Sequence, residues 1–168
     1  MARHRRGPEG ASEAQPSGRQ PASDHGRLTA QRALGASSPG GAWLAGGVAA
    51  AALVVYVATL APGLSVEHYG YDGGDLIAAA RSLGIPHPTG YPTYTLLAHL
   101  FTFLPVGTIA YRANLLSAVC AAASAGLLCR IAQVVLPTGR YALAISAATG
   151  LTLAFSSLLW SQAVITEV

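Results

Sequence analysis

The sequence predicts an all-α membrane protein, and three observations lead to that prediction. Of its 168 residues, 52% are hydrophobic and only 10% are charged, a balance much too apolar for an ordinary soluble domain. The mean hydropathy is +0.43. Alanine and glycine are abundant, and no alternation of apolar and polar residues typical of a β-barrel is visible. We therefore expect helical spans, in which every backbone group is satisfied within the membrane.

Residues 1–41 form an arginine-rich head that we expect to be disordered. This head holds six of the ten arginines and three of the seven acids, so it carries the whole net charge of +3. It is rich in Gly, Pro, Ser and Ala and has no hydrophobic periodicity that could bury a core. Nucleic-acid binding is an alternative for such a tail, but no aromatic residues are interleaved with the basic ones. We therefore expect no nucleic-acid partner and interpret the charge as a topology signal.

Residues 42–61 (AWLAGGVAAAALVVYVATLA) are predicted to form the first membrane span. The run has 20 residues and no charge, and as a helix it would match a hydrocarbon core about 30 Å thick. A cleaved signal peptide has a shorter apolar region of about 7–15 residues and a shorter basic leader, so we favour a retained anchor. The arginines before the span place the N-terminus in the cytoplasm and the following segment outside.

An outer loop is predicted over about residues 62–111. Asp75–Leu83 (DLIAAARSL) contains helix-forming residues and is followed by Gly84 and Pro86, so it should form a short helix along the membrane surface. Residues 91–104 (YPTYTLLAHLFTFL) are apolar over only 14 residues. Segments of that length are more often interfacial or re-entrant than spanning.

Two further spans are predicted, at residues 112–136 and 141–160. Both runs are long and apolar, and their small residues would let neighbouring helices approach closely. Whether residues 91–104 also cross the membrane stays open. The positive-inside rule favours no crossing, because Arg130 and Arg140 then lie at the cytoplasmic end. The resulting transmembrane part has three spans.

The stretch between the first two spans concentrates ionisable residues. It includes Asp72, Asp75, Arg81 and His87 within residues 71–92 (YDGGDLIAAARSLGIPHPTGYP). Ionisable groups this close to a membrane segment cost free energy unless they serve a purpose, so their clustering indicates a functional site. A structural alternative is that Asp72 caps the surface helix while Asp75 completes an arrangement like a capping box. Similarly, Arg81 alone would be explained by snorkelling to lipid headgroups.

Several motifs resemble one family, in the same order along the chain. They are DGGDL, AAARSLGIPHPTGYPTY, LLAHLFTFLP, YRANLLSA and WSQAVITEV. With these motifs the sequence is similar to the bacterial DUF2723 membrane proteins, whose animal relative is a transmembrane protein O-mannosyltransferase. The similarity runs from about Thr59 to the last residue. At Gly73, Asp75 and Thr89 this chain departs from the serine, glutamate and proline that are usual in the family.

The resemblance implies a GT-C type glycosyltransferase fold for residues 42–168, with surface or re-entrant helices in the first outer loop. The implied enzyme lies in the lipid bilayer and takes a hexose, with mannose as first choice, from a polyprenyl-phosphate donor. Its acceptor would be protein Ser/Thr hydroxyls or a glycan. The matching motif positions imply Asp72, Asp75 and Glu167 as catalytic acids. Asp72 and Glu167 are also the implied ligands of a divalent cation, Mg²⁺ or Mn²⁺.

Substrate-binding roles are implied for Arg81, His87 and Tyr91. Arg81 would stabilise charge on the departing phosphate, and His87 would orient the phosphate or a carboxylate. For Tyr91, a place in an interfacial aromatic belt is the alternative. We expect the chain to be an N-terminal fragment of a multi-pass plasma-membrane protein, inactive alone, with its site outside the cell. A transporter or a non-catalytic membrane scaffold is the alternative function.

Overall fold

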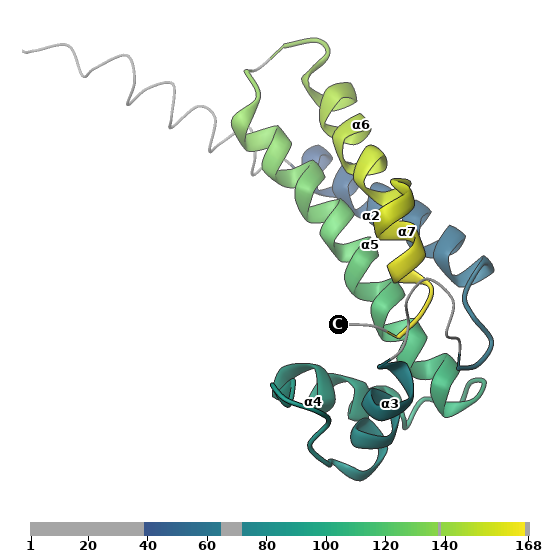
Figure 1. The fold of residues 1–168 in the computed structure, drawn as a ribbon. Helices are drawn as coiled ribbons and strands as arrows, with labels where there is room; N and C mark the ends of the chain where they lie inside the picture. The colour runs from purple at the N-terminus through teal and green to yellow at the C-terminus, as the bar shows by residue number, and fades with distance from the viewer. Residues whose placement is uncertain (1–38, 65–71, 138, 167–168) are drawn as a thin grey trace, which may run out of the picture.

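The computed structural model describes residues 39–64, 72–137 and 139–166, which form six α-helices and no strand (Figure 1). The helices are α2 (Pro39–Ala58), α3 (Gly73–Ser82), α4 (Pro92–Phe101), α5 (Ile109–Val135), α6 (Ala142–Ala154) and α7 (Ser157–Ala163). The all-α prediction is confirmed. The expected disordered head, residues 1–41, lies outside the described residues except for positions 39–41, which already belong to α2.

Two of these helices are long and apolar enough to cross a membrane. They cover Gly40–Ala58 and Ile109–Val135. Helices α6 and α7 have 13 and 7 residues and are each too short to span. They pass the same test only as a pair, which is bent by 60° at a short break. The span expected at residues 141–160 is thus a broken helix. Helix α4 has 10 residues, which is about 15 Å of helix and half the thickness of a hydrocarbon core.

Small residues let α2, α5 and α6 cross with their backbones close together. A Cβ added to Gly126 on α5 would lie 3.0 Å from the Ala45 carbonyl oxygen on α2. A Cβ added to Gly150 on α6 would lie 2.7 Å from the Ala125 carbonyl oxygen on α5. Lipid tails are as apolar as the side chains, so spans associate through such close packing more than through the hydrophobic effect. Glycine is therefore the residue that fits at both crossings.

Tyr56 satisfies the backbone where α6 ends. Its side chain is fully buried, and its hydroxyl donates to the Ala154 carbonyl oxygen at 2.7 Å. Ser156 starts α7, because its hydroxyl donates to the Leu153 carbonyl and accepts from the Leu159 amide. In lipid, a helix break is tolerated where such partners exist. Neither proline nor glycine marks this break, which is why the sequence predicts a continuous span.

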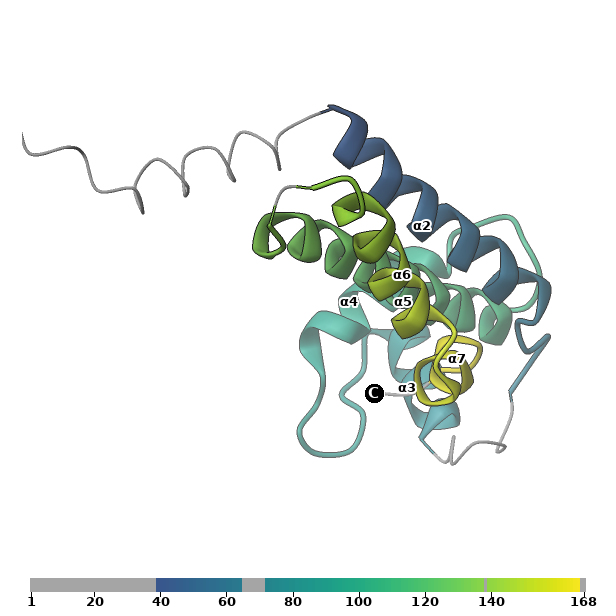
Figure 2. The same ribbon diagram turned by 90° about the horizontal axis from the view of Figure 1, so that it is seen from above.

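The chain leaves α2 and enters α5 at the same end of the bundle, where α3 and α4 lie (Figure 1 and Figure 2). Thr108, just before α5, donates to the carbonyl oxygen of Pro62, just after α2. Helices α3 and α4 pack against each other and against α5. Helix α4 is not one of the candidate spans, and the expectation that residues 91–104 do not cross the membrane stays a prediction.

Arg112 fixes the end of α4 to the first turn of α5. Its guanidinium donates to the carbonyl oxygens of Thr102, Val106 and Gly107 at 2.6, 2.7 and 3.1 Å. All three carbonyls follow α4 in the connection to α5, and a cation near a helix C-terminus also complements the helix dipole. The arginine therefore holds the end of α4 in place against α5.

Gly150→Ala should weaken the bundle, because the added methyl group would overlap a backbone carbonyl. We expect the free energy of unfolding to fall by about 1–3 kcal/mol, measured by thermal unfolding in detergent micelles followed by circular dichroism. Gly46→Ala is the matched control, since nothing lies within 4 Å of a Cβ at that position. Equal stability of the two variants would contradict this account of helix packing.

Candidate functional site

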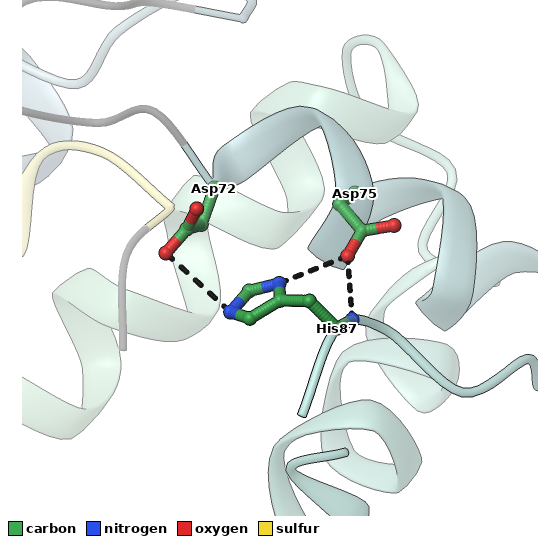
Figure 3. A network of polar contacts seen from close by, with 3 residues as sticks. All are labelled: Asp72, Asp75 and His87. Carbon is green, nitrogen blue, oxygen red and sulfur yellow. Dashed lines mark hydrogen bonds and ion pairs between the residues drawn. The ribbon is translucent and has the colours of Figure 1, made fainter. Parts of the chain in front are cut away.

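Two carboxylates at the start of α3 converge on one imidazole ring (Figure 3). Asp72 directly precedes α3, Asp75 lies in its first turn, and His87 lies in the loop before α4. Asp75 Oδ2 accepts the backbone N–H of His87 at 2.8 Å and lies 3.0 Å from the ring Nδ1. Asp72 Oδ2 lies 3.5 Å from Nε2, the other ring nitrogen. The ring therefore bridges the two carboxylates.

The electrostatics of this cluster follow from what each group can donate. An ionised carboxylate only accepts hydrogen bonds, so Asp75 favours a proton on Nδ1 of His87. The backbone N–H of His87 is the largest cause of a lowered pKa for Asp75, and the ring hydrogen bond is the next. The side chains of His87, Asp72 and Asp75 are 34%, 46% and 52% exposed. Solvent therefore reaches all three side chains.

Local chain stiffness holds His87 in place. It lies between Pro86, which is buried, and Pro88, which is exposed, and both prolines restrict the backbone. The Gly90 amide donates to the His87 carbonyl at 2.9 Å, and Gly90 has a φ of 88° that glycine adopts readily. Tyr91 follows with a φ of 38°, unusual for a tyrosine and a form of strain found at binding sites. Its ring meets the His87 ring edge-on, with centroids 5.4 Å apart.

A cleft of about 720 Å³ lies beside this loop. The loop before α4, α4 itself, α5 and α7 form its walls, which include Thr89, Tyr91, Tyr94, Leu97, Leu116 and Gln162. The walls are mostly apolar with a few polar side chains, a composition typical of sites for small or amphiphilic molecules. Tyr91 both contacts His87 and lines the cleft. It therefore joins the charged cluster to the apolar space.

Asn114 of α5 connects two segments that flank the cluster. It is 2% exposed, and its Nδ2 donates to the carbonyl oxygens of Ala61 and Gly63 at 2.9 and 3.1 Å. Its Oδ1 accepts from the Thr166 hydroxyl at 2.6 Å. Thr166 in turn touches α3, since a Cβ added to Gly73 would lie 3.0 Å from the Thr166 carbonyl oxygen. The segment after α7 thus packs against the start of α3.

The predicted catalytic acids are only partly covered by the structure. Asp72 and Asp75 lie together at His87. Glu167 lies outside the described residues, but its neighbour Thr166 touches Gly73, the residue after Asp72. The capping-box alternative is wrong, because Asp72 occupies the N-cap position without any side-chain capping bond. The catalytic roles themselves stay predictions.

The predicted substrate-binding residues separate into two groups. His87 and Tyr91 lie at the cluster and the cleft. Arg81 is exposed in the last turn of α3. Over the described ranges, no hydrogen bond or ion pair joins Arg81 to Asp72, Asp75 or His87. The contact predicted between Arg81 and a phosphate therefore does not involve the cluster.

The expected divalent cation finds no site among the described residues. These contain no group of three His, Cys, Asp or Glu side chains arranged to hold a metal ion. The His87 ring occupies the space between the carboxylates of Asp72 and Asp75 (Figure 3). A cation on Asp72 and Glu167 stays a prediction, since Glu167 falls outside the described range.

The sequence alone predicts no role for Asn114, Arg112 or Gln162. Asn114 and Arg112 are both in the YRANLLSA motif, and Gln162 is in the WSQAVITEV motif. A polar amide inside an otherwise apolar run is the signal that could have found Asn114, because such groups need a partner in the bundle. Gln162 carries no comparable signal, since it lies near the end of its apolar run.

The fold and the site define a class of protein. It is a helical membrane protein with a cluster of carboxylates and an imidazole at one end of its helix bundle. The family described as the Protein O-mannosyl-transferase TMEM260 N-terminal domain matches residues 72–168. That match covers more than half of the chain, and the chain belongs to this family. The kinship expected from the motifs is confirmed for the animal relative, while the DUF2723 assignment stays a prediction.

Two relatives carry the same name. Protein O-mannosyl-transferase TMEM260 of Mus musculus is 43% identical over 126 residues, which are 74% of this chain and 17% of the relative. Protein O-mannosyl-transferase tmem260 of Dictyostelium discoideum is 37% identical over 57 residues, which are 33% of this chain and 6% of the relative. The matches thus span less than a fifth of the length of either relative. No solved structure matches the chain.

Asn114→Leu should destabilise the protein, because it removes the partner of two carbonyl oxygens and one hydroxyl. We expect a loss of about 1–3 kcal/mol for each buried polar group left unsatisfied, measured by unfolding in detergent micelles. Thr149→Val is the control, since that hydroxyl only donates to Ile145 in its own helix. If both variants unfold alike, Asn114 does not hold the two segments together.

The Asp75 carboxyl should titrate below the ordinary aspartate value of about 3.9. Because its pKa is lowered in the fold, Asp75 stabilises the folded chain above about pH 3.9, and this contribution is lost as the pH falls through the lower folded value. Carbon-detected NMR titration of the carboxyl group measures the midpoint. His87→Ala should raise it only part of the way, since the backbone N–H remains. An ordinary midpoint in the unmodified chain would rule out the observed contacts.

Proposed function

We propose that this chain is part of a GT-C type membrane glycosyltransferase that transfers mannose from a polyprenyl-phosphate donor to protein Ser/Thr hydroxyls. Both relatives carry the name protein O-mannosyl-transferase, which supports the reaction class and a protein acceptor. The observation that carries the proposal is the cluster of Asp72, Asp75 and His87 beside an apolar cleft. Since the chain spans 17% of the mouse relative, the activity is proposed for the full-length protein.

The proposed reaction needs a group that accepts a proton. The acceptor oxygen attacks C1 of the sugar as its O–H bond breaks, and the bond from C1 to the phosphate oxygen breaks with its electron pair leaving on the polyprenyl phosphate. Asp72 is the proposed base, because its carboxylate is exposed and makes no capping bond. A positioned base commonly contributes about 10²–10⁴-fold to the rate. Glu167 is proposed to act beside it from the segment that follows Thr166.

The cleft suits the lipid part of the proposed donor. Its walls are mostly apolar, and Tyr91 lies where the cleft meets His87. An isoprenoid chain in the cleft would leave its phosphate at the polar end. Arg81 is the proposed phosphate partner, since a cation placed where negative charge develops stabilises a departing phosphate. His87 is proposed to orient a carboxylate, because both its ring nitrogens face Asp72 and Asp75.

The charge distribution supports an extracytoplasmic site. Gln133, near the end of α5, donates to the Gly41 carbonyl at the start of α2, so those helix ends lie together. Arg130 bonds Gln133 there, at the end of α5 opposite to the cluster. The positive-inside rule then places this end and the arginine-rich head in the cytoplasm. We propose the plasma membrane as location, with Asp72 and Asp75 facing outward.

Asp72→Asn in the full-length protein should lower sugar transfer from a lipid-linked donor by about 10²–10⁴-fold, because the amide cannot accept the proton. Radiolabelled donor and an acceptor peptide would measure it. Ser82→Ala is the control, since that hydroxyl donates to Ala78 in its own helix and lies outside the cluster. Undiminished transfer by Asp72→Asn removes the base assignment. A full-length protein that moves substrate across the membrane without any glycosyl product would favour the transporter alternative.

A further inference from the structure

We propose that Asp75 is a positioning residue, whose carboxylate fixes the His87 ring so that Nε2 faces Asp72. The resemblance to the family implied Asp75 as a catalytic acid beside Asp72. In the structure the Asp75 oxygen Oδ2 is instead committed to His87 twice (Figure 3). The orientation of the His87 ring follows from these contacts alone. The consequence of that orientation for catalysis rests on the proposed function.

The two contacts made by Asp75 fix both the backbone and the ring of the same residue. The backbone N–H of His87 lies 2.8 Å from Oδ2, and Nδ1 lies 3.0 Å from the same oxygen. Because one atom receives both groups, the ring cannot rotate without losing a hydrogen bond. Asp75 itself lies in the first turn of α3, a regular helix that packs against α4 and α5. The imidazole is thus held by a rigid element.

The consequence for His87 is a defined tautomer. With a proton on Nδ1, the neutral ring turns the lone pair of Nε2 towards Asp72, 3.5 Å away. A carboxylate that orients a histidine in this way acts through the histidine and needs no contact with substrate. The Tyr91 ring, edge-on at 5.4 Å, lies against another side of the imidazole. Asp75 therefore determines which nitrogen is available at the base.

The proposed path of the proton follows from that tautomer. Asp72 takes the proton of the acceptor hydroxyl as the new bond to C1 forms. Nε2 of His87 can then receive this proton, which regenerates the Asp72 carboxylate and leaves an imidazolium between two carboxylates. Release of the proton to water restores the starting state. The distance of 3.5 Å between Nε2 of His87 and Oδ2 of Asp72 has to shorten for this step. Catalytic hydrogen bonds commonly shorten in this way when substrate binds.

Stability alone gives a poor account of this cluster. All three side chains are at least a third exposed, and ion pairs between exposed groups contribute little to folding. Two carboxylates on one ring also bring like charges together, which a purely structural contact would avoid. The loop that carries His87 continues into the wall of the cleft through Thr89 and Tyr91. Position, rather than stability, is what the arrangement provides.

The direct test is the tautomer of His87, read by nitrogen NMR on the chain in lipid nanodiscs. The five histidines would carry ¹⁵N, and His87→Gln would identify the signal of interest. Spectra would be recorded at a pH where further increase no longer shifts that signal, so that the ring is neutral. We expect the Nδ1–H tautomer in the unmodified chain and the Nε2–H tautomer in Asp75→Ala.

Asp72→Ala is the matched control, because it removes the other carboxylate and leaves both Asp75 contacts in place. It should keep the Nδ1–H tautomer. The proposal is overturned if the unmodified chain shows mainly Nε2–H, or if Asp75→Ala leaves the tautomer unchanged. An equal effect of Asp72→Ala and Asp75→Ala would overturn it as well. None of these results depends on sugar transfer.

Kinetics of the full-length protein test the consequence. Asp75→Ala should lower kcat by about 10²-fold, the cost of a misplaced catalytic group, with little change in KM for the lipid donor. Asp75→Glu keeps the carboxylate and should restore most of the rate. A rise in KM at unchanged kcat would show that Asp75 binds donor and would overturn the positioning role. If no variant of the protein transfers sugar while the tautomer result holds, only the proposed function fails.

Discussion

The hydrogen bonds of the Asn114 amide are the constraint on which the end of the bundle beside Asp72 depends. They join the chain after α2, the N-terminal part of α5 and the segment after α7. The Ala61 amide adds a bond to the Val164 carbonyl at 3.0 Å. Because Asn114 is buried, each of these bonds would be costly to leave unmade. Segments more than fifty positions apart therefore meet beside Asp72.

The charged cluster is built on that frame by different forces. Helix α3 supplies the two carboxylates from its first turn and the position before it, and prolines and a glycine turn hold the loop that carries His87. Neither element needs a substrate to be in place. A site organised in advance avoids the cost of arranging its polar groups during a reaction. The apolar cleft beside it offers space for a molecule that is itself partly apolar.

The sequence was sufficient to predict the elements that depend on local composition. Long apolar runs predicted α2 and α5, and acids close to a membrane segment marked Asp72 and Asp75. Contacts between distant residues were beyond it. The pairing of His87 with Asp75 crosses 12 positions and depends on how a loop folds back on a helix. The break after α6 depends partly on a hydroxyl from α2, and the local capping by Ser156 is not accompanied by a proline or glycine that would mark it.

That hydroxyl belongs to Tyr56, and it shapes a space that it does not touch. By holding the end of α6, it permits the 60° turn after which Leu159, Gln162 and Ala163 of α7 form a wall of the cleft. Without the Tyr56 hydroxyl, the Ala154 carbonyl would need another hydrogen-bond donor. A continuous helix through α6 and α7 would supply one, and α7 would then no longer line the cleft. A substitution at Tyr56 would therefore change the shape of the cleft, although Tyr56 is not among the residues that line it.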